Sequence, residues 1–314
     1  MQNLLFSFEV VGPVFLIILL GFVLRRREVI TDEFISVSSR LVFTVALPVF
    51  VFIRLSSTDL FMVFDANVVL LSVGATITIF IFAWVLAIFT IRDGRSQGPF
   101  IQGTYRSNFG IIGFVIIYNM YGEAGLGKAA IVLSATMPIY NSLAVMALTI
   151  PVKKDRNMKF GSIGMDILTN PLNIATLCGI CVSILHLPLG TIIVKTGHYL
   201  AAMTLPLALI GVGGSLTFYS IRNSFNEAII AALIKIVVYP LLFGAIAYYF
   251  GFRGEDFGIL FILFACPTAI VSFIMAQTMN SNADLAANII LLSTIGSVVT
   301  LSVGIFLLKS FGLI

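Results

Sequence analysis

Apolar residues run through this chain in long, nearly uncharged windows separated by short polar segments. A helix needs about 20 consecutive apolar residues to cross the hydrocarbon core of a bilayer. Windows of that length recur along the whole sequence, and they are continuously apolar, whereas the strands of a membrane barrel would alternate in polarity. The pattern therefore predicts ten membrane helices, at 7–24, 36–53, 67–91, 100–120, 129–150, 167–186, 198–219, 227–250, 257–278 and 286–308.

Composition supports an all-α polytopic membrane protein. Of the 314 residues, 59% are hydrophobic and only 10% are charged. A soluble domain carries roughly 25% charged residues, so most of this surface must face lipid. The net charge of +4 comes from cations clustered between apolar runs, not from a basic stripe. The lipid bilayer is therefore an expected partner, and nucleic acid is not.

The positions of the basic residues predict the orientation, because short cytoplasmic loops collect Lys and Arg. One set of alternate loops, with their flanks, holds Arg25, Arg26, Arg27, Arg40, Arg92, Arg95, Lys153, Lys154, Arg156, Lys159 and Arg222, and the other holds Arg54, Lys128, Lys195, Arg253 and Lys309. We therefore expect a multi-pass protein of the cell membrane with both termini outside.

Landmarks of the first half recur in the second half at a nearly fixed offset. Pro13 matches Pro171 and Gly21 matches Gly179 at an offset of 158, and residues 131–134 match 290–293 at an offset of 159. Five spans per half is an odd number, so the halves would enter the membrane from opposite faces, as in the inverted repeats of secondary transporters. The predicted units are a first repeat at 1–150, a cytoplasmic linker at 151–163 and a second repeat at 164–314.

Two spans contain residues that interrupt a helix at mid-depth. Asn108 in span four aligns with Pro267 in span nine at the offset of 159. Proline ends or starts a helix because it lacks an amide proton, and asparagine is a favoured N-cap. If the two breaks cross, two half-helix N-termini would offer backbone amides and partial positive charge to an anion. The alternative is a pair of kinked packing helices.

Two cations fall inside predicted spans. A charge as deep as Arg106 costs ~2.5 to 3.5 kcal/mol on insertion scales, so it needs a partner. That partner could be a substrate, a helix C-terminus or a distant acid, unless the side chain snorkels to the surface. Lys235, five residues before Pro240, is expected either to neutralise carbonyls at the crossing as a structural cation or to respond to transport as a coupling cation.

No other motif predicts catalysis, a cofactor or a metal site. The stretch from Gly122 to Ala129 nearly matches a phosphate-binding loop but lacks its final Ser or Thr and its preceding strand. Cys178 and Cys181 lie within a span and favour a packing role, and His186 and His198 flank one outward loop. With no nucleophile, base or ligand set at mid-depth, we do not expect an enzyme.

Several segments carry a resemblance that extends over nearly the whole chain. They are Tyr105 to Gly110 with Gly113, Ala265 to Ile270 with Ser272 and Ala276, Leu47 with Pro48, Asn141, and Lys235 with Pro240. On these residues the chain resembles the auxin efflux carrier family, which includes plant auxin exporters and bacterial malate and malonate permeases. The resemblance implies a ten-helix, five-plus-five fold with spans four and nine crossed. It also implies scaffold helices 1, 2, 6 and 7, transport helices 3–5 and 8–10, a homodimer and a carboxylate substrate.

We therefore expect a secondary transporter that moves a small organic anion by alternating access, in an elevator-like manner. The expected substrate-binding residues are Arg106, Asn108, Gly110, Tyr140, Asn141, Pro267 and Thr268. A sodium or proton antiporter, or an ion-coupled symporter, is the first alternative. It is disfavoured because such sites use acids at mid-depth, while the acids here lie near predicted span ends. A membrane sensor that keeps the carrier fold without transporting is the second alternative.

Overall fold

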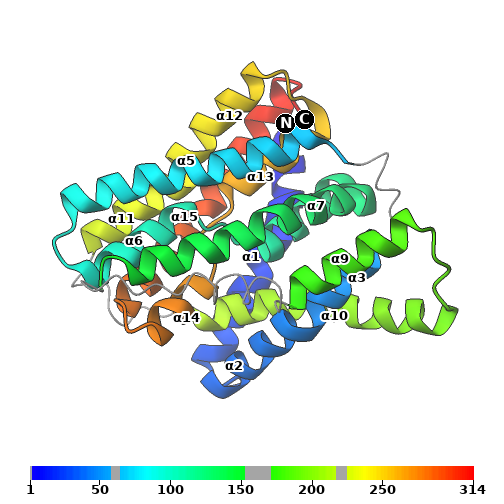
Figure 1. Ribbon diagram of the computed structural model, residues 1–314, viewed down its shortest axis with the longest axis horizontal. Coiled ribbons are helices and arrows are strands. Elements are labelled where there is room, and N and C mark those ends of the chain that lie inside the picture. The colour runs from blue at the N-terminus through cyan, green and yellow to red at the C-terminus, as the bar shows by residue number, and fades with distance from the viewer. Residues whose placement is uncertain (1, 58–63, 153–170, 217–224) are drawn as a thin grey trace.

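The computed structural model describes residues 2–57, 64–152, 171–216 and 225–314 (Figure 1). Within these ranges the regular structure is helical, apart from one isolated pair of bridged residues. A helix of 25 residues is about 37 Å long, enough to cross a hydrocarbon core of about 30 Å. Seven described segments are long and apolar enough to do so: Asn3–Arg26, Asp32–Ser56, Ala66–Thr90, Phe109–Thr149, Thr191–Ser215, Phe225–Tyr249 and Ala283–Ser310.

The seven segments and the ten predicted spans differ at identifiable places. Most of spans four and five falls in the segment Phe109–Thr149, where Gly122 has a non-helical backbone (φ 64°, ψ −149°). Positive φ at this position is tolerated because glycine has no Cβ. Span nine is divided into two helices that are each shorter than a full crossing, and the described part of span six covers only Pro171–Ile184. Most of the predicted linker lies outside the described residues.

One group of helices combines the start of each half of the chain. It consists of α1 (Gln2–Arg26), α2 (Asp32–Leu41), the π-helical turn η1 (Val42–Ala46), α3 (Leu47–Ser56), α9 (Pro171–Ile184) and α10 (Thr191–Ser215). In this first group α1 packs along α10, and α3 packs along α9. Glycines allow both close approaches: a Cβ on Gly21 would lie 2.9 Å from Cα of Ile210, and one on Gly179 would lie 2.9 Å from Cβ of Leu55.

The remaining helices form a second group, most of which lies on the upper left of Figure 1. Asp65, Asp93 and Asn282 cap three of these helices, because each side chain accepts a hydrogen bond from a first-turn amide. The group consists of α5 (Ala66–Thr90), α6 (Gly94–Tyr105), η2 (Phe109–Gly113), α7 (Phe114–Thr149), α11 (Phe225–Leu233), η3 (Ile234–Val238), α12 (Tyr239–Tyr249), α13 (Gly254–Ala265), α14 (Val271–Thr278) and α15 (Ala283–Ser310).

The two ends of the chain lie together. Asn3 Nδ2 donates to Ser310 Oγ over 3.2 Å, and Ser7 Oγ donates to the carbonyl of Ser302 over 2.5 Å. Figure 1 shows the N and C labels side by side. We call this the terminal end of the bundle, and the end where α1 turns into α2 the opposite end.

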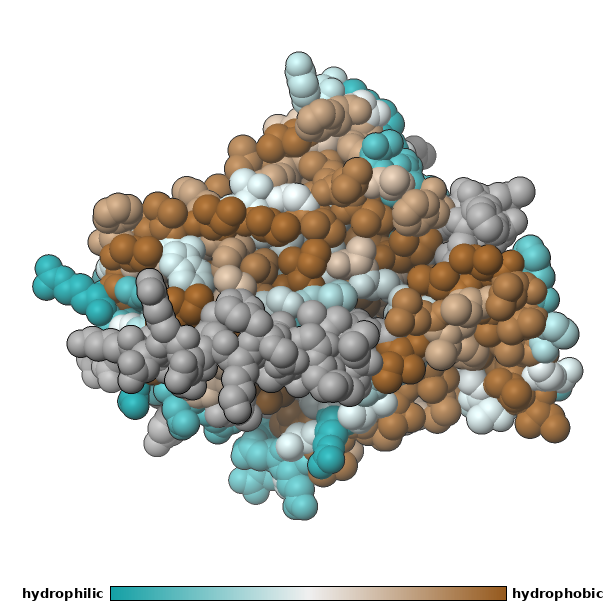
Figure 2. Space-filling model, viewed as in Figure 1, coloured by the Kyte–Doolittle hydropathy of each residue, from teal (hydrophilic) through white to brown (hydrophobic). Residues whose placement is uncertain are grey.

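The surface is apolar over much of the visible face, with hydrophilic residues mostly toward its margins (Figure 2). Large side chains such as Phe89 and Ile192 are 83% and 82% exposed. Soluble monomers rarely expose contiguous apolar surface on this scale, so these side chains face lipid. The fold is that of a multi-pass membrane protein.

Candidate functional site

Two helices of the second group are interrupted in the interior. α6 ends at Tyr105, Arg106 is extended (φ −78°, ψ 103°), and η2 begins at Phe109. α13 ends at Ala265, Cys266 has φ −56° and ψ 142°, and α14 begins at Val271. Both interruptions lie in the segments where the sequence predicts broken spans.

The two interruptions pair with each other through their backbones. Ser107 and Thr268 form an isolated antiparallel bridge. The amide of Asn108 donates to the carbonyl of Pro267 over 2.8 Å, and the amide of Ala269 donates to the carbonyl of Arg106 over 3.0 Å. Non-helical backbone at membrane depth needs such internal partners, because lipid offers none. The two broken segments therefore cross in direct contact.

This pairing corrects one expectation about the helix starts. Pro267 is not the first residue of the second half-helix, because α14 starts four residues later at Val271. The side chain of Asn108 makes no capping hydrogen bond, although Asn108 does precede η2. The amides of Asn108 and Ala269 bond to the opposite strand and are not free for an anion. Pairing between distant segments has replaced the local capping that the sequence predicts.

In α6 and in α13, the two helices that end at the crossing, one backbone carbonyl of the last turn accepts a hydrogen bond from a side chain. Thr268 Oγ1 donates to the carbonyl of Gly103 in α6 over 2.6 Å. Lys235 Nζ donates to the carbonyl of Phe264 in α13 over 2.6 Å. Lys235 is fully buried and its Nζ also lies 4.7 Å from the centre of the Tyr239 ring. A cation at a helix C-terminus is favourable because the aligned peptide dipoles are negative there.

The π-helical turn η3 carries Lys235. Pro240 follows it in the first turn of α12 and cannot donate to the carbonyl four residues back. The preceding turn is widened, so that the amide of Tyr239 bonds to the carbonyl of Ile234, five residues back. η1 has the same arrangement before Pro48, with the amide of Leu47 bonded to the carbonyl of Val42.

Arg106 is buried at the crossing, and its hydrogen-bond acceptors among the described residues are neutral. The residue is 2% exposed, so its side chain does not snorkel to the surface. Its Nη2 donates to Asn141 Oδ1 over 2.8 Å, and its Nη1 donates to Met275 Sδ over 3.0 Å. No carboxylate among the described residues forms an ion pair with it.

A large cavity separates the two groups of helices on one side of the crossing. Its volume is about 840 Å³, and it extends from Arg106 and Asn141 to Asp32 and Arg40 in α2. Residues of α2, η1 and α10 line it from the first group, and residues of α14 and α15 from the second. Asp32 is paired with Arg25 over 2.6 Å, so Arg40 and Arg106 leave the lining positively charged.

A small pocket of about 30 Å³ adjoins the large cavity at the crossing. Arg106 lines both spaces, Asn108, Gly110 and Tyr140 line the small pocket, and Asn141 lines the large cavity. Five of the seven predicted binding residues therefore line one or both of these adjoining cavities. Pro267 and Thr268 line neither space, because their polar groups bond within the crossing. Lys235 also lines neither space.

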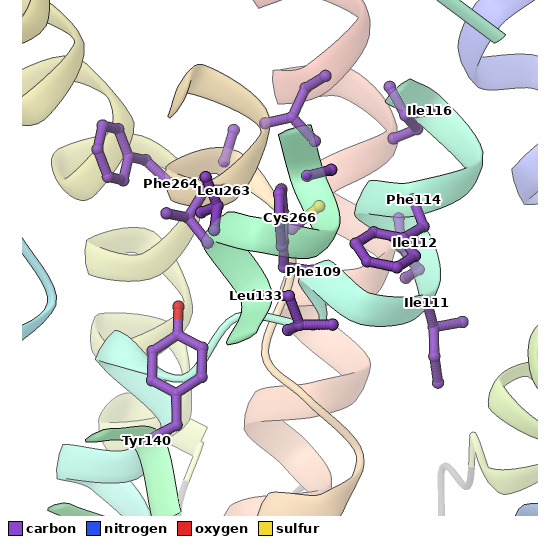
Figure 3. Packing of buried hydrophobic residues seen from close by; sticks show 14 of the residues in the cluster. Phe109, Ile111, Ile112, Phe114, Ile116, Leu133, Tyr140, Leu263, Phe264 and Cys266 are labelled. Atoms are coloured by element: carbon purple, nitrogen blue, oxygen red, sulfur yellow. The ribbon is translucent and has the colours of Figure 1, made fainter. Parts of the chain in front are cut away.

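Toward the terminal end, the crossing is sealed by apolar packing. Figure 3 shows Cys266 beside Phe109, with Phe114 and Ile112 next to them. The rings of Phe109 and Phe114 lie 5.7 Å apart, and Phe114 lies 5.7 Å from Phe50 of the first group. An ion pair between Arg54 and Glu123 links the two groups on the same side.

Some residues of the site carried no usable signal in the sequence. Met275 accepts from Arg106 and, over 3.6 Å, from Gln102 Nε2, yet a methionine in an apolar run predicts only packing. Ser293, whose Oγ accepts from the amide of Thr268, stood out only as a member of the repeat.

Comparison with known proteins agrees with this architecture. The family described as "Membrane transport protein" matches residues 6–305. An uncharacterized transporter of Methanothermobacter thermautotrophicus is 28% identical over 302 residues, which cover 94% of this chain and 96% of that protein. A Rhizobium meliloti protein named "Putative malonate transporter" is 25% identical over 310 residues, 95% of this chain and 94% of its own. An uncharacterized transporter of Escherichia coli is 22% identical over 318 residues, 94% and 95% of the two chains.

The apolar helices and these relatives together define a multi-pass membrane transport protein. The chain belongs to the membrane transport protein family, that of the auxin efflux carriers, and the resemblance inferred from the sequence is confirmed. The family and these relatives are described as transport proteins.

Proposed function

We propose that the protein is a secondary transporter that carries a small organic anion with a carboxylate group, bound at Arg106 beside the crossing. One observation carries this proposal: a guanidinium that is 2% exposed, has no carboxylate partner among the described residues and faces a cavity of about 840 Å³.

The chemistry of the pocket supports an anionic ligand. Burying a charge is costly unless it is paired, and a carboxylate can accept two parallel hydrogen bonds from one guanidinium. The present acceptors of Arg106, an amide oxygen and a thioether, are neutral and can be displaced. Asn108 lines the adjoining pocket, and its Nδ2 has no hydrogen-bond partner among the described residues. A carboxylate would satisfy both donors.

The position of the cavity supports alternating access by an elevator-like movement. The cavity lies between the two groups of helices and reaches toward the opposite end, while Phe50, Phe114 and the Arg54–Glu123 pair close the terminal end. In the proposal the first group is the scaffold and the second group moves with the substrate. Contacts at the terminal end would break as a matching cavity opens there.

The ten-span, inverted-repeat reading belongs to this proposal. α1 packs on α10 as α9 packs on α3, which is the equivalence expected if α9 repeats α1 and α10 repeats α3. The two interruptions meet antiparallel, as a two-fold axis in the membrane plane requires. By the distribution of basic residues, the open end would face the cytoplasm and both termini would lie outside the cell membrane. The homodimer likewise remains a proposal.

The substrate class is proposed from the site together with a relative. A Rhizobium meliloti relative carries malonate in its name, and malonate is a small carboxylate. For this chain we propose carboxylates as a class, with malonate as the first compound to test.

Uptake into liposomes tests the proposal. Purified protein is reconstituted and supplied with labelled malonate or benzoate, and Arg106→Leu is compared with Arg92→Leu, which changes an exposed arginine before α6. We expect Arg106→Leu to lower uptake about 100-fold through loss of a buried charge-assisted contact, and Arg92→Leu to leave it within about twofold.

Other outcomes would favour the alternatives. Equal uptake by Arg106→Leu and wild type would contradict the proposed site. Binding without uptake would favour a sensor. Uptake that requires a sodium or proton gradient would favour an ion-coupled transporter over transport driven by the membrane potential alone.

A further inference from the structure

The small pocket at the crossing adjoins the large cavity, because the two share lining residues. Both spaces are lined by Arg106 and by four apolar side chains, Phe43, Leu47, Met137 and Val271. A ligand that lies in the large cavity and bonds to Arg106 can therefore place one end in the small pocket.

Part of the lining of the small pocket is polar and includes a side-chain donor without a hydrogen-bond partner among the described residues. Arg106, Ser107 and Asn108 form this part, which is the interrupted backbone after α6. Asn108 is 5% exposed, and its Nδ2 has no hydrogen-bond partner among the described residues. A buried donor without a partner costs about 1 to 3 kcal/mol, so an acceptor placed in this pocket would be favoured.

The rest of the lining is mostly apolar and includes Gly110 and Leu133, which lie close together. A Cβ on Gly110 would lie 3.1 Å from Cδ2 of Leu133, closer than an ordinary contact. Gly110 is not among the residues with positive φ, so its backbone does not require glycine. The absence of a side chain therefore provides space. Leu133, from α7, is 3% exposed and also lines the pocket.

We propose that Gly110 and Leu133 are specificity-determining residues that size this pocket for the planar head group of a carboxylate and exclude tetrahedral anions such as sulfonates. This inference rests on the proposed function and deepens it. A water-sized group needs about 10 to 15 Å³, so a pocket of about 30 Å³ holds two such groups. A carboxylate brings two oxygens, and a sulfonate brings a third. In this proposal the rest of the substrate lies in the large cavity, where the size of the small pocket does not limit it.

Matched pairs of anions test the inference directly. Benzoate with benzenesulfonate, and malonate with methanedisulfonate, keep the body and the charge while changing the head group. Binding to the purified full-length protein is measured by thermal shift across a concentration series, since a ligand stabilises the state that it binds. We expect wild type to bind the carboxylate of at least one pair about tenfold more tightly than the sulfonate.

Three variants assign the selectivity to this pocket. Leu133→Ala should tighten sulfonate binding, because it adds room for the third oxygen. The ratio of carboxylate affinity to sulfonate affinity should then fall by at least about threefold. Gly110→Ala should fill the pocket and weaken both anions. Leu126→Ala removes a similarly buried leucine of α7 that lines neither cavity, and should keep the wild-type ratio. If Leu133→Ala does not fold, Leu133→Val should change the ratio in the same direction by less.

The outcomes separate this inference from the proposed function. Equal binding of carboxylate and sulfonate by wild type would overturn the proposed selection by Gly110 and Leu133. So would an unchanged ratio of the two affinities in both Leu133 variants. Neither result would contradict the proposed anion transport. If wild type binds none of the four anions, both proposals fail together.

Discussion

Two buried cations lie at the same crossing, and their surroundings differ. Arg106 borders both cavities and bonds to side-chain acceptors that a ligand could displace. Lys235 borders neither cavity and bonds to a backbone carbonyl at the end of α13. Neither forms an ion pair with a carboxylate in the described part of the chain. Depth and charge alone therefore do not distinguish the two residues: the first charge borders a cavity that could hold a ligand, whereas the second is bonded to the end of a helix.

The largest expected difference is in stability, between variants that replace each of the two buried cations by an apolar residue. Lys235→Met should lower the free energy of unfolding by about 2 to 3 kcal/mol, because the carbonyl of Phe264 loses a charged donor. Arg106→Leu should leave stability unchanged or raise it, since Arg106 and its acceptor Asn141 line the large cavity, where water can replace the lost hydrogen bond. Thermal unfolding of both purified variants in one detergent measures this. If Lys235→Met were as stable as wild type but inactive in transport, Lys235 would be a coupling residue.

A carboxylate tethered at Arg106 should compete with the substrate. Asn141→Asp keeps the shape of the side chain and places a carboxylate oxygen at the present 2.8 Å contact. We expect anion affinity to fall about 30-fold, or about 2 kcal/mol, because the guanidinium is already paired. Asn67→Asp, the same change at an exposed position of α5, serves as the control. Unchanged affinity in Asn141→Asp would mean that the anion binds elsewhere.

Loss of the Thr268 hydroxyl, which donates to a carbonyl in the last turn of α6, should have a smaller effect on stability. Thr268→Val removes the 2.6 Å bond to the carbonyl of Gly103 without changing the shape of the side chain. We expect a loss of about 1 to 2 kcal/mol in unfolding free energy. Thr78→Val removes an exposed hydroxyl that bonds only within α5 and should change stability by less than about 0.5 kcal/mol. Equal effects of the two substitutions would show that the crossing does not depend on this bond.

The smallest expected effect is at the terminal end. Glu123→Gln weakens the pair with Arg54, and its side chain is 56% exposed. Exposed ion pairs contribute at most about 1 kcal/mol, so transport should change by less than about fivefold. The sensitivity of transport to salt on that side should also decrease. A complete loss of transport would assign Glu123 a larger role than closing the terminal end.

The sequence predicts much of the fold because membrane spans are encoded locally. The apolar windows identify the helices that the structure describes as long enough to cross, and Asn108 and Pro267 lie within the two interruptions. The exact start of α14 at Val271 could not be predicted. It depends on bonds between Arg106 and Ala269 and between Asn108 and Pro267, which are far apart in the sequence.

The site is predicted less completely for the same physical reason. Arg106, Asn108, Gly110, Tyr140 and Asn141 line the two adjoining cavities. Arg106 is identified as a charge and Asn108 as a helix break at mid-depth, whereas Gly110 and Asn141 belong to the segments that carry the family resemblance. The partner of Lys235 is a carbonyl 29 residues away, and a carbonyl has no residue-specific signal. The role of Met275 depends on a contact with Arg106 across 169 residues, which a single sequence cannot reveal.

The most direct measurement is a structure determined with the carboxylate that gives the largest thermal shift. We expect carboxylate oxygens about 3 Å from the guanidinium of Arg106 and from Nδ2 of Asn108, with the contact between Arg106 and Asn141 lengthened or lost. A ligand bound elsewhere, with Arg106 still bonded to Asn141 and Met275 as it is now, would contradict it.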